Sequence, residues 1–128
     1  MGNTPKSSKS EKAIEHEILN YLNRIEGCFA WKVNTTGIFD GVVYRKAASP
    51  FIFAGVSDII GVFKGTIIAF EVKTETGKTS KPQEVFISKI QRCGGVSGVV
   101  RSVQDVRRVL LAVGLLTEGL NDGVSIVQ

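Results

Sequence analysis

The chain lacks the residue patterns that define cysteine-rich, membrane-spanning and triad-based proteins. Its two cysteines, Cys28 and Cys93, form no C-x-x-C pair, so neither a disulfide framework nor a zinc knuckle is indicated. The single histidine, His16, argues against a hydrolytic triad. No apolar run is long enough to cross a membrane, and the polar N-terminus does not resemble a signal peptide. We therefore expect a soluble protein of the cytoplasm that has no membrane partner.

The residues that are present fit one globular domain with a basic surface. The chain of 128 residues is 43% hydrophobic and 22% charged, which suffices for one core but not for two. A formal net charge of +4 favours a polyanionic partner. Residues 1–10 form a basic polar tail that we expect to be disordered, and residues 11–128 form the single domain.

The stretch that organises the chain covers residues 55–73. It predicts a β-hairpin, because two apolar, β-branched runs are joined by a short turn that contains glycine. If the hairpin pairs about Lys64, Asp58 and Glu71 come to lie near each other at the end far from the turn. Because strand side chains alternate between faces, Lys73 shares the face of Glu71.

Such a cluster of charges in an apolar hairpin suggests metal chemistry. Two carboxylates at close range repel each other unless a cation lies between them. A hard divalent ion such as Mg²⁺ binds carboxylate oxygens and keeps waters that can be activated. A lysine beside the ion could orient a nucleophile and stabilise the charge that develops on a phosphate. The alternative is a half-exposed hairpin that carries a surface Glu–Lys pair.

The first helix is predicted at residues 11–25, where apolar side chains form a stripe. Glu11 and Glu15 fall inside this stripe, whereas Glu17 points away from it. Two carboxylates on a buried face suggest a functional role. Glu11 also has a structural alternative, because Ser8-x-x-Glu11 matches a capping box.

A strand and a long loop follow this helix. Residues 29–34 predict the strand, in which Trp31 is expected to belong to the core. Residues 35–49 predict a loop that carries Arg45 and Lys46. A loop of this length inside a compact domain is usually functional or disordered.

A second basic turn covers residues 74–81. The Gly-Lys-Thr triplet around Lys78 mimics the end of a P-loop, but the earlier glycine that this motif needs would stand at Val72. We therefore expect no nucleotide cofactor. Lys78 and Lys81 are instead predicted to contact a DNA backbone.

Ser80 is a good N-cap for a helix at residues 81–92, and Gln83 could complete a capping box with it. Phe86 and Ile90 of this helix are predicted to face the core.

Residues 96–101 predict the next strand, which we interpret as internal because it is apolar with small residues between. Ser102 and Asp105 then predict the start of a last amphipathic helix. The side chains expected to point inward from this helix are Val103, Val106, Val109, Leu110 and Val113. The tail after Gly114 could add an edge strand or a subunit contact. The order of all these elements predicts an α/β sandwich, with a central mixed β-sheet flanked by helices.

Several of these segments together resemble the VRR-NUC family of the PD-(D/E)xK nuclease superfamily, known from phages and repair proteins. Residues 55–60 are similar to the family's G-V-P-D-I segment, with Ser57 in place of the proline. The E-V-K element is present at residues 71–73. Residues 80–86 are similar to L-S-x-x-Q-x-x-F, and residues 94–103 to the G-G…V-V-R-S segment.

The resemblance implies a restriction-endonuclease-like fold and metal-dependent hydrolysis of DNA. It assigns the ligands of a Mg²⁺ or Mn²⁺ ion to Asp58, Glu71 and the carbonyl of Val72. Lys73 would position or activate the attacking water, and Gln83 would support it as an alternative or addition to its capping role. In-line attack would leave a 5′-phosphate, as is usual in the superfamily.

The resemblance also bears on the helix and on the loop. The family has an acidic residue in its first helix, and Glu11 occupies that position while Glu15 stands where the family has glutamine. Which of the two completes the metal site stays open. The loop before the catalytic aspartate lies near the substrate in this family, so Arg45 and Lys46 are either phosphate contacts or two solvated charges.

Small stand-alone members of the family resemble junction resolvases, which cut four-way DNA as homodimers because two symmetric strands need two active sites. We therefore expect a structure-specific endonuclease for Holliday junctions or flaps, which acts in DNA replication, recombination or repair in a bacterial cell or a phage-infected host. One alternative is a DNA-binding module whose nuclease site is vestigial. Another is a small-molecule-binding or structural α/β domain with a fortuitous E-x-K.

Overall fold

The computed structural model describes residues 9–33, 38–39, 44–45 and 50–118. Its main element is a four-stranded sheet in the order β1-β4-β5-β6, in which β1, β4 and β5 pair antiparallel and β6 pairs parallel to β5. The sheet strands are β1 (Cys28–Lys32), β4 (Ile59–Phe63), β5 (Thr66–Val72) and β6 (Val96–Val100). The helices are α1 (Glu11–Leu22), α2 (Lys81–Arg92) and α3 (Val103–Ala112). The prediction of an α/β fold with a mixed sheet flanked by helices is confirmed.

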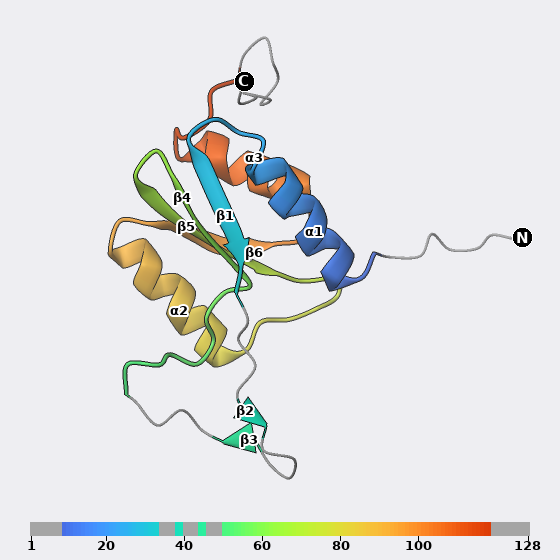
Figure 1. Ribbon diagram of the computed structural model, residues 1–128, viewed down its shortest axis with the longest axis vertical. Helices are drawn as coiled ribbons and strands as arrows, with labels where there is room; N and C mark the ends of the chain where they lie inside the picture. Colours follow the sequence, from blue (N-terminus) through green and yellow to red (C-terminus); the bar gives the residue numbers. More distant parts are fainter. Residues whose placement is uncertain (1–8, 34–37, 40–43, 46–49, 119–128) are drawn as a thin grey trace, which may run out of the picture.

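The helices divide between the two faces of the sheet. Figure 1 shows α2 apart from α1 and α3, with the sheet between them. The main core lies on the side of α1 and α3, where buried side chains of α1 meet those of α3 and of every second residue of the central strands. These core residues include Ile18, Leu110, Ile59, Phe70 and Val72. The opposite face of β5 presents Glu71 toward α2, so the alternation predicted for residues 71–73 is confirmed.

The hairpin of β4 and β5 forms as predicted. Its two-residue turn consists of Lys64 and Gly65, both with positive φ (50° and 85°), which is the signature of a type I′ turn. Phe63 pairs with Thr66 across this turn. The predicted hairpin stretch began at residue 55, whereas β4 begins at Ile59.

The four residues before β4 follow a different path because Gly55 packs against α2. Gly55 has a φ of 83°, and a Cβ added to it would lie 2.4 Å from the carbonyl carbon and oxygen of Pro82. Only glycine allows this close approach. The contact fixes the segment that leads into Asp58 against the first turn of α2.

Helix α1 differs from the prediction at both ends. Ser10, not Ser8, is the N-cap, and its hydroxyl oxygen accepts a hydrogen bond from the N–H of Ala13, so Glu11 is the first helical residue rather than a capping-box partner. The helix ends at Leu22 instead of residue 25. Asn23 ends it, because its side-chain amide donates to the carbonyl oxygens of Leu19 and Ala30 and its oxygen accepts the N–H of Ala30.

Strand β1 is an edge strand, and Asn23 occupies part of that edge by pairing with Ala30. The strand covers Cys28–Lys32 rather than residues 29–34. Trp31 was predicted in the core but is 43% exposed and stacks on Phe29, with 5.4 Å between ring centroids. The reason is that α2 covers β5 and β6, which leaves the β1 side of that face open.

Strand β6 was predicted to be internal and is instead the other edge of the sheet. Its apolar sequence reflects helices on both faces, since α2 and α3 both pack against it. Helix α2 buries no residue completely, so the inward prediction for Phe86 and Ile90 is only half right. Phe86 contacts Phe53, with 5.7 Å between their rings. In α3 the inward stripe is confirmed except at Val113, which follows the helix and is 50% exposed.

The region predicted as a loop at residues 35–49 contains a short antiparallel pair, β2 (Ile38–Phe39) and β3 (Tyr44–Arg45). The loop prediction is wrong at these four residues, because backbone pairing needs no long apolar run. The predicted disordered tail lies outside the described residues except for Lys9 and Ser10, and the tail after residue 118 lies wholly outside them. Within the described part of the chain, no helix is both long and apolar enough to cross a membrane.

Candidate active site

Two carboxylates meet where β4 begins and β5 ends. Ile59 pairs with Phe70, so the next step of the antiparallel register sets Asp58 opposite Glu71. The Oδ2 atom of Asp58 accepts a hydrogen bond of 2.7 Å from the N–H of Val72. The hairpin therefore brings Asp58 and Glu71 together as the sequence predicted, and Asp58 is tied to the backbone of the opposite strand.

Glu71 is the centre of this cluster. Glu71 is only 2% exposed, although its side chain ends in a carboxyl group. Its Oε2 atom accepts a hydrogen bond of 2.8 Å from the side-chain amide of Gln83 and lies 3.7 Å from the ammonium of Lys73. Its Oε1 atom is buried and receives no hydrogen bond from the described residues. One oxygen is thus held by the protein, while the other lacks a donor.

This environment raises the pKa of Glu71 from 4.5 to about 8. Burial is the largest cause, because it penalises the charged form. The negative charge of Asp58 and a hydrogen bond between the two carboxyl groups act in the same direction, as does the charge of Glu11, whereas Lys73 lowers the pKa. A proton held between the two carboxyl groups would supply the donor that Oε1 lacks.

Gln83 fills its predicted capping role and also contacts Glu71. Its side-chain oxygen accepts a hydrogen bond of 2.8 Å from the N–H of Ser80, and the hydroxyl of Ser80 accepts one of 3.3 Å from the N–H of Gln83. This is a complete capping box at the start of α2. The amide nitrogen of Gln83 stays free to donate to Glu71. The cap therefore holds the amide in the orientation in which it reaches the carboxylate.

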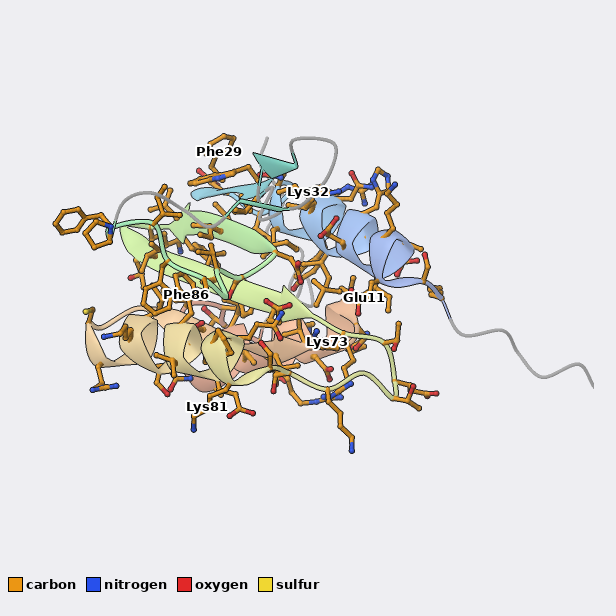
Figure 2. The ribbon with its side chains drawn as sticks, turned by 90° about the horizontal axis from the view of Figure 1, so that it is seen from below. Glu11, Phe29, Lys32, Lys73, Lys81 and Phe86 are labelled. Carbon is orange, nitrogen blue, oxygen red and sulfur yellow. The ribbon has the colours of Figure 1, made fainter. Side chains whose placement is uncertain are left out.

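The prediction that both helix glutamates lie on the buried face holds for Glu15, whose side chain is 12% exposed, and is wrong for Glu11. Glu11 is exposed at the first turn of α1, where the chain has not yet entered the core, and Glu15 is partly buried. The ammonium of Lys32 lies 3.3 Å from a carboxylate oxygen of Glu15, so Glu15 pairs with β1. Only Glu11 acts electrostatically on Glu71. Of the two candidates, the structure thus favours Glu11, which Figure 2 labels together with Lys73.

The predicted DNA contacts are placed only in part. Lys78 and Lys81 are both exposed. Lys78 lies in the segment that joins β5 to α2, and Lys81, labelled in Figure 2, is the first residue of α2. Arg45 lies in β3, and Lys46 lies outside the described residues.

Arg101 joins this site although no role was predicted for it. Its Nη1 atom donates to the carbonyl oxygens of Thr74 and Gly77, the latter at 2.9 Å. The backbone N–H of Arg101 donates a hydrogen bond of 2.8 Å to the carboxylate of Asp105. Its partners in the connecting segment are backbone carbonyls, which leave no trace in a sequence pattern; the arginine of the V-V-R-S resemblance was the only available signal.

No protein-family model matches the chain, and no curated protein matches it significantly.

The donor set of the cluster fits a hard divalent cation. Two carboxyl groups lie together, one with a buried and unpartnered oxygen, and their mutual repulsion would be relieved by a cation between them. The described residues contain no group of three or more histidine, cysteine, aspartate or glutamate side chains that could hold a metal. A cation here would rely on the carboxylates of Asp58 and Glu71, and on water or backbone oxygen such as the carbonyl of Val72.

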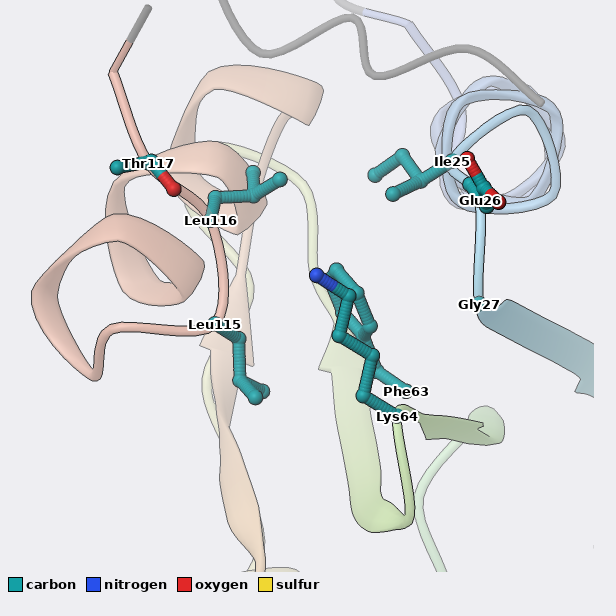
Figure 3. A pocket seen from close by; sticks show the side chains of 8 residues that line it. All are labelled: Ile25, Glu26, Gly27, Phe63, Lys64, Leu115, Leu116 and Thr117. Carbon is teal, nitrogen blue, oxygen red and sulfur yellow. The ribbon is translucent and has the colours of Figure 1, made fainter. Parts of the chain in front are cut away.

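A pocket lies at the other end of the hairpin, beside its turn (Figure 3). It has a volume of about 480 Å³ and is lined by apolar groups such as Phe63 and Leu115, with Glu26 and Lys64 as its titratable residues. This pocket contains no pair of carboxylates, so its chemistry differs from that of the Asp58–Glu71 cluster.

Proposed function

We propose that the chain is a metal-dependent DNA endonuclease with a restriction-endonuclease-like fold of the VRR-NUC kind. The observation that carries the proposal is Glu71, a buried carboxyl group opposite Asp58 whose Oε2 atom meets both Gln83 and Lys73. A buried carboxylate pair beside an ammonium is costly for stability, so a catalytic role explains it better than a structural one.

In this proposal Asp58 and Glu71 hold the Mg²⁺ or Mn²⁺ ion, with the carbonyl of Val72. When bound, such an ion lowers the pKa of a coordinated water and neutralises charge on the phosphate. The hydrogen bond from the N–H of Val72 fixes one oxygen of Asp58 and leaves the other available. The hydrogen bond from Gln83 fixes the Oε2 atom of Glu71 and leaves its Oε1 atom available. Both carboxylates are thus oriented before any ion binds.

Lys73 is the group that would act on the reacting atoms. Its ammonium lies on the same face as Glu71, where it can orient a water and donate to a phosphate oxygen as negative charge develops. Gln83 supports this arrangement by orienting Glu71, and Glu11 adds negative charge from α1. Glu15 has no part in the proposal because it is paired with Lys32.

The proposed substrate is DNA, and branched DNA in particular. The net charge of +4 and the exposed Lys78 and Lys81 suit a phosphate backbone. An α/β domain of this size has little means to recognise base sequence, so shape is the more suitable signal. Symmetric cutting of a four-way junction would need a homodimer. The setting would be replication, recombination or repair in a bacterial or phage-infected cell.

The test is cleavage of labelled four-way junction, flap, duplex and single-stranded DNA with Mg²⁺ or Mn²⁺. We expect cleavage that EDTA abolishes and that Lys73→Ala lowers by about 100-fold or more, because a preorganised charge at the reacting phosphate is lost. Lys89→Ala is the matched control, since Lys89 is an exposed residue of α2 outside the cluster. Paired symmetric cuts in the junction would support a dimeric resolvase. DNA binding without any cleavage would favour the vestigial module instead.

A further inference from the structure

The segment that connects β5 to α2 carries little structure of its own. This connecting loop, residues 74–79, lies between Lys73 at the end of β5 and the N-cap Ser80 of α2. Arg101, just after β6, binds it through Nη1, which donates to the carbonyl oxygens of Thr74 and Gly77 and approaches that of Glu75 at 3.4 Å. A single guanidinium nitrogen therefore contacts three carbonyl oxygens of the loop.

The loop in turn lies against the stem of Lys73. A Cβ added to Gly77 would stand 3.3 Å from Cδ of Lys73 and 3.4 Å from its Cβ. A methyl group at this position would press against the aliphatic part of the lysine, so the loop lies beside the lysine stem. Arg101 binds the carbonyl of this same Gly77. The guanidinium thus holds the loop at the residue that lies beside the lysine stem.

Lys73 depends on this support because its own polar contact is loose. Its ammonium is 3.7 Å from the nearest oxygen of Glu71, which is too long for a hydrogen bond. A lysine stem has four rotatable carbon–carbon bonds, and a loose ion pair does not hold it in one conformation. The side chain is nevertheless only 14% exposed, so packing rather than pairing keeps it in place.

We propose that Arg101 is a positioning residue, which holds the connecting loop against Lys73 and so keeps the lysine ammonium beside Glu71. This inference rests on the proposed nuclease function, in which Lys73 acts at the phosphate. Arg101 has a charge that binds neutral carbonyl oxygens rather than a carboxylate, and its backbone is anchored by Asp105 at the start of α3. In this proposal the position of Lys73 therefore depends on how α3 and β6 hold Arg101.

The test compares Arg101→Met and Arg101→Lys with the matched control Arg92→Met, an exposed arginine in the last turn of α2. Steady-state cleavage gives kcat and KM, and NMR of protein carrying ¹³C-labelled lysine side chains reports the surroundings of Lys73. Arg101→Met is expected to lower kcat about 10- to 100-fold, the loss typical of a misplaced catalytic group, with KM changed less than about threefold. The Lys73 signal should move more than that of any other lysine, and Arg101→Lys should restore only part of the rate because it lacks the planar fork.

Gly77→Ala provides a second test that leaves the arginine in place. The added methyl group presses on the lysine stem at 3.3 Å, so it should move the same NMR signal and lower kcat. This variant carries the test if Arg101→Met fails to fold.

The outcomes separate this inference from the function on which it rests. If the wild-type protein cleaves DNA and Arg101→Met keeps the wild-type kcat, the role of Arg101 is wrong and the nuclease proposal stands. A lowered kcat with an unmoved Lys73 signal also overturns the role, because Arg101 would then act elsewhere. If the wild-type protein cleaves no substrate with either metal ion, both proposals fall.

Discussion

Glu71 combines two properties that conflict in a stable protein. It is almost fully buried, and it stands opposite a second carboxyl group, so its ionised form is disfavoured twice. The pKa of about 8 means that the metal-free protein keeps this group largely protonated at neutral pH. A cation that binds the pair would favour the ionised form and release the proton.

The raised pKa predicts how stability depends on pH. A carboxyl group whose folded pKa exceeds its unfolded value stabilises the fold below the unfolded pKa, and this contribution is lost as pH rises through the folded pKa. For Glu71 the window runs from 4.5 to about 8. The free energy of unfolding of metal-free protein should therefore fall across this window, by at most about 1.4 kcal/mol per pH unit from this group.

Urea denaturation at pH 5, 6, 7 and 8 measures this dependence. Glu71→Gln should flatten the slope, whereas Glu26→Gln, which changes an exposed carboxylate, should leave it unchanged. A wild-type protein that is equally stable at pH 5 and pH 8 would show that Glu71 is not held protonated. Added Mn²⁺ should raise stability most at the upper end of the window, because the ion competes there with the fewest protons.

Sequence reasoning at the residue scale succeeded where local pairing decides the position. The register of one hairpin fixes the positions of Asp58, Glu71 and Lys73. The capping box that begins at Ser80 fixes the position of Gln83. Sequence reasoning failed at Glu11, which was expected on the buried face of the helix but is exposed, because the first turn of α1 lies outside the core. Arg101 gave no signal beyond the V-V-R-S resemblance, because its loop partners are carbonyl oxygens, which every residue carries.

Among the elements, α2 and the segment before β4 are joined by one glycine. Gly55 has a positive φ, and a Cβ added to it would lie 2.4 Å from the backbone of Pro82, so a side chain there meets both backbone strain and a rigid neighbour. This contact sets the distance between Asp58, which follows Gly55, and Gln83, which follows Pro82. The end of the hairpin that carries the carboxylates and the helix that contacts it are thereby held together.

Gly55→Ala should therefore destabilise the protein by about 2–4 kcal/mol, since strain and overpacking both contribute. Thermal unfolding measures the loss. Gly98→Ala is the matched control, because Gly98 lies in β6 with no positive φ and no atom within 4 Å of an added Cβ. Equal melting temperatures for the two variants would show that Gly55 is not tightly packed against α2.

At the scale of the whole molecule, the basic charge should govern the proposed binding to DNA. Lys78 and Lys81 lie at the end of the hairpin that carries the carboxylates, whereas Lys64 lies in the turn at the other end. Binding that relies on phosphate contacts weakens with salt, because each neutralised phosphate releases counterions.

Fluorescence anisotropy with junction DNA in EDTA measures this binding without cleavage. The affinity should fall steeply between low and moderate salt, and Lys78→Ala and Lys81→Ala should each reduce the salt slope by about 1. Lys64→Ala should leave the slope unchanged. If the three variants behave alike, the DNA does not lie along the connecting loop.

The sequence by itself determined the parts of this protein that depend on neighbours along the chain. The type I′ hairpin, the caps of α2 and α3 and the convergence of Asp58, Glu71 and Lys73 all depend on interactions a few residues long or on one turn. Tertiary structure decided the order of strands, which made β6 an edge and left Trp31 exposed. It also placed Glu11 rather than Glu15 close enough to act on Glu71, and it bound Arg101 to the loop before α2. These features depend on which surfaces meet across the sheet, and periodicity along the chain does not contain that information.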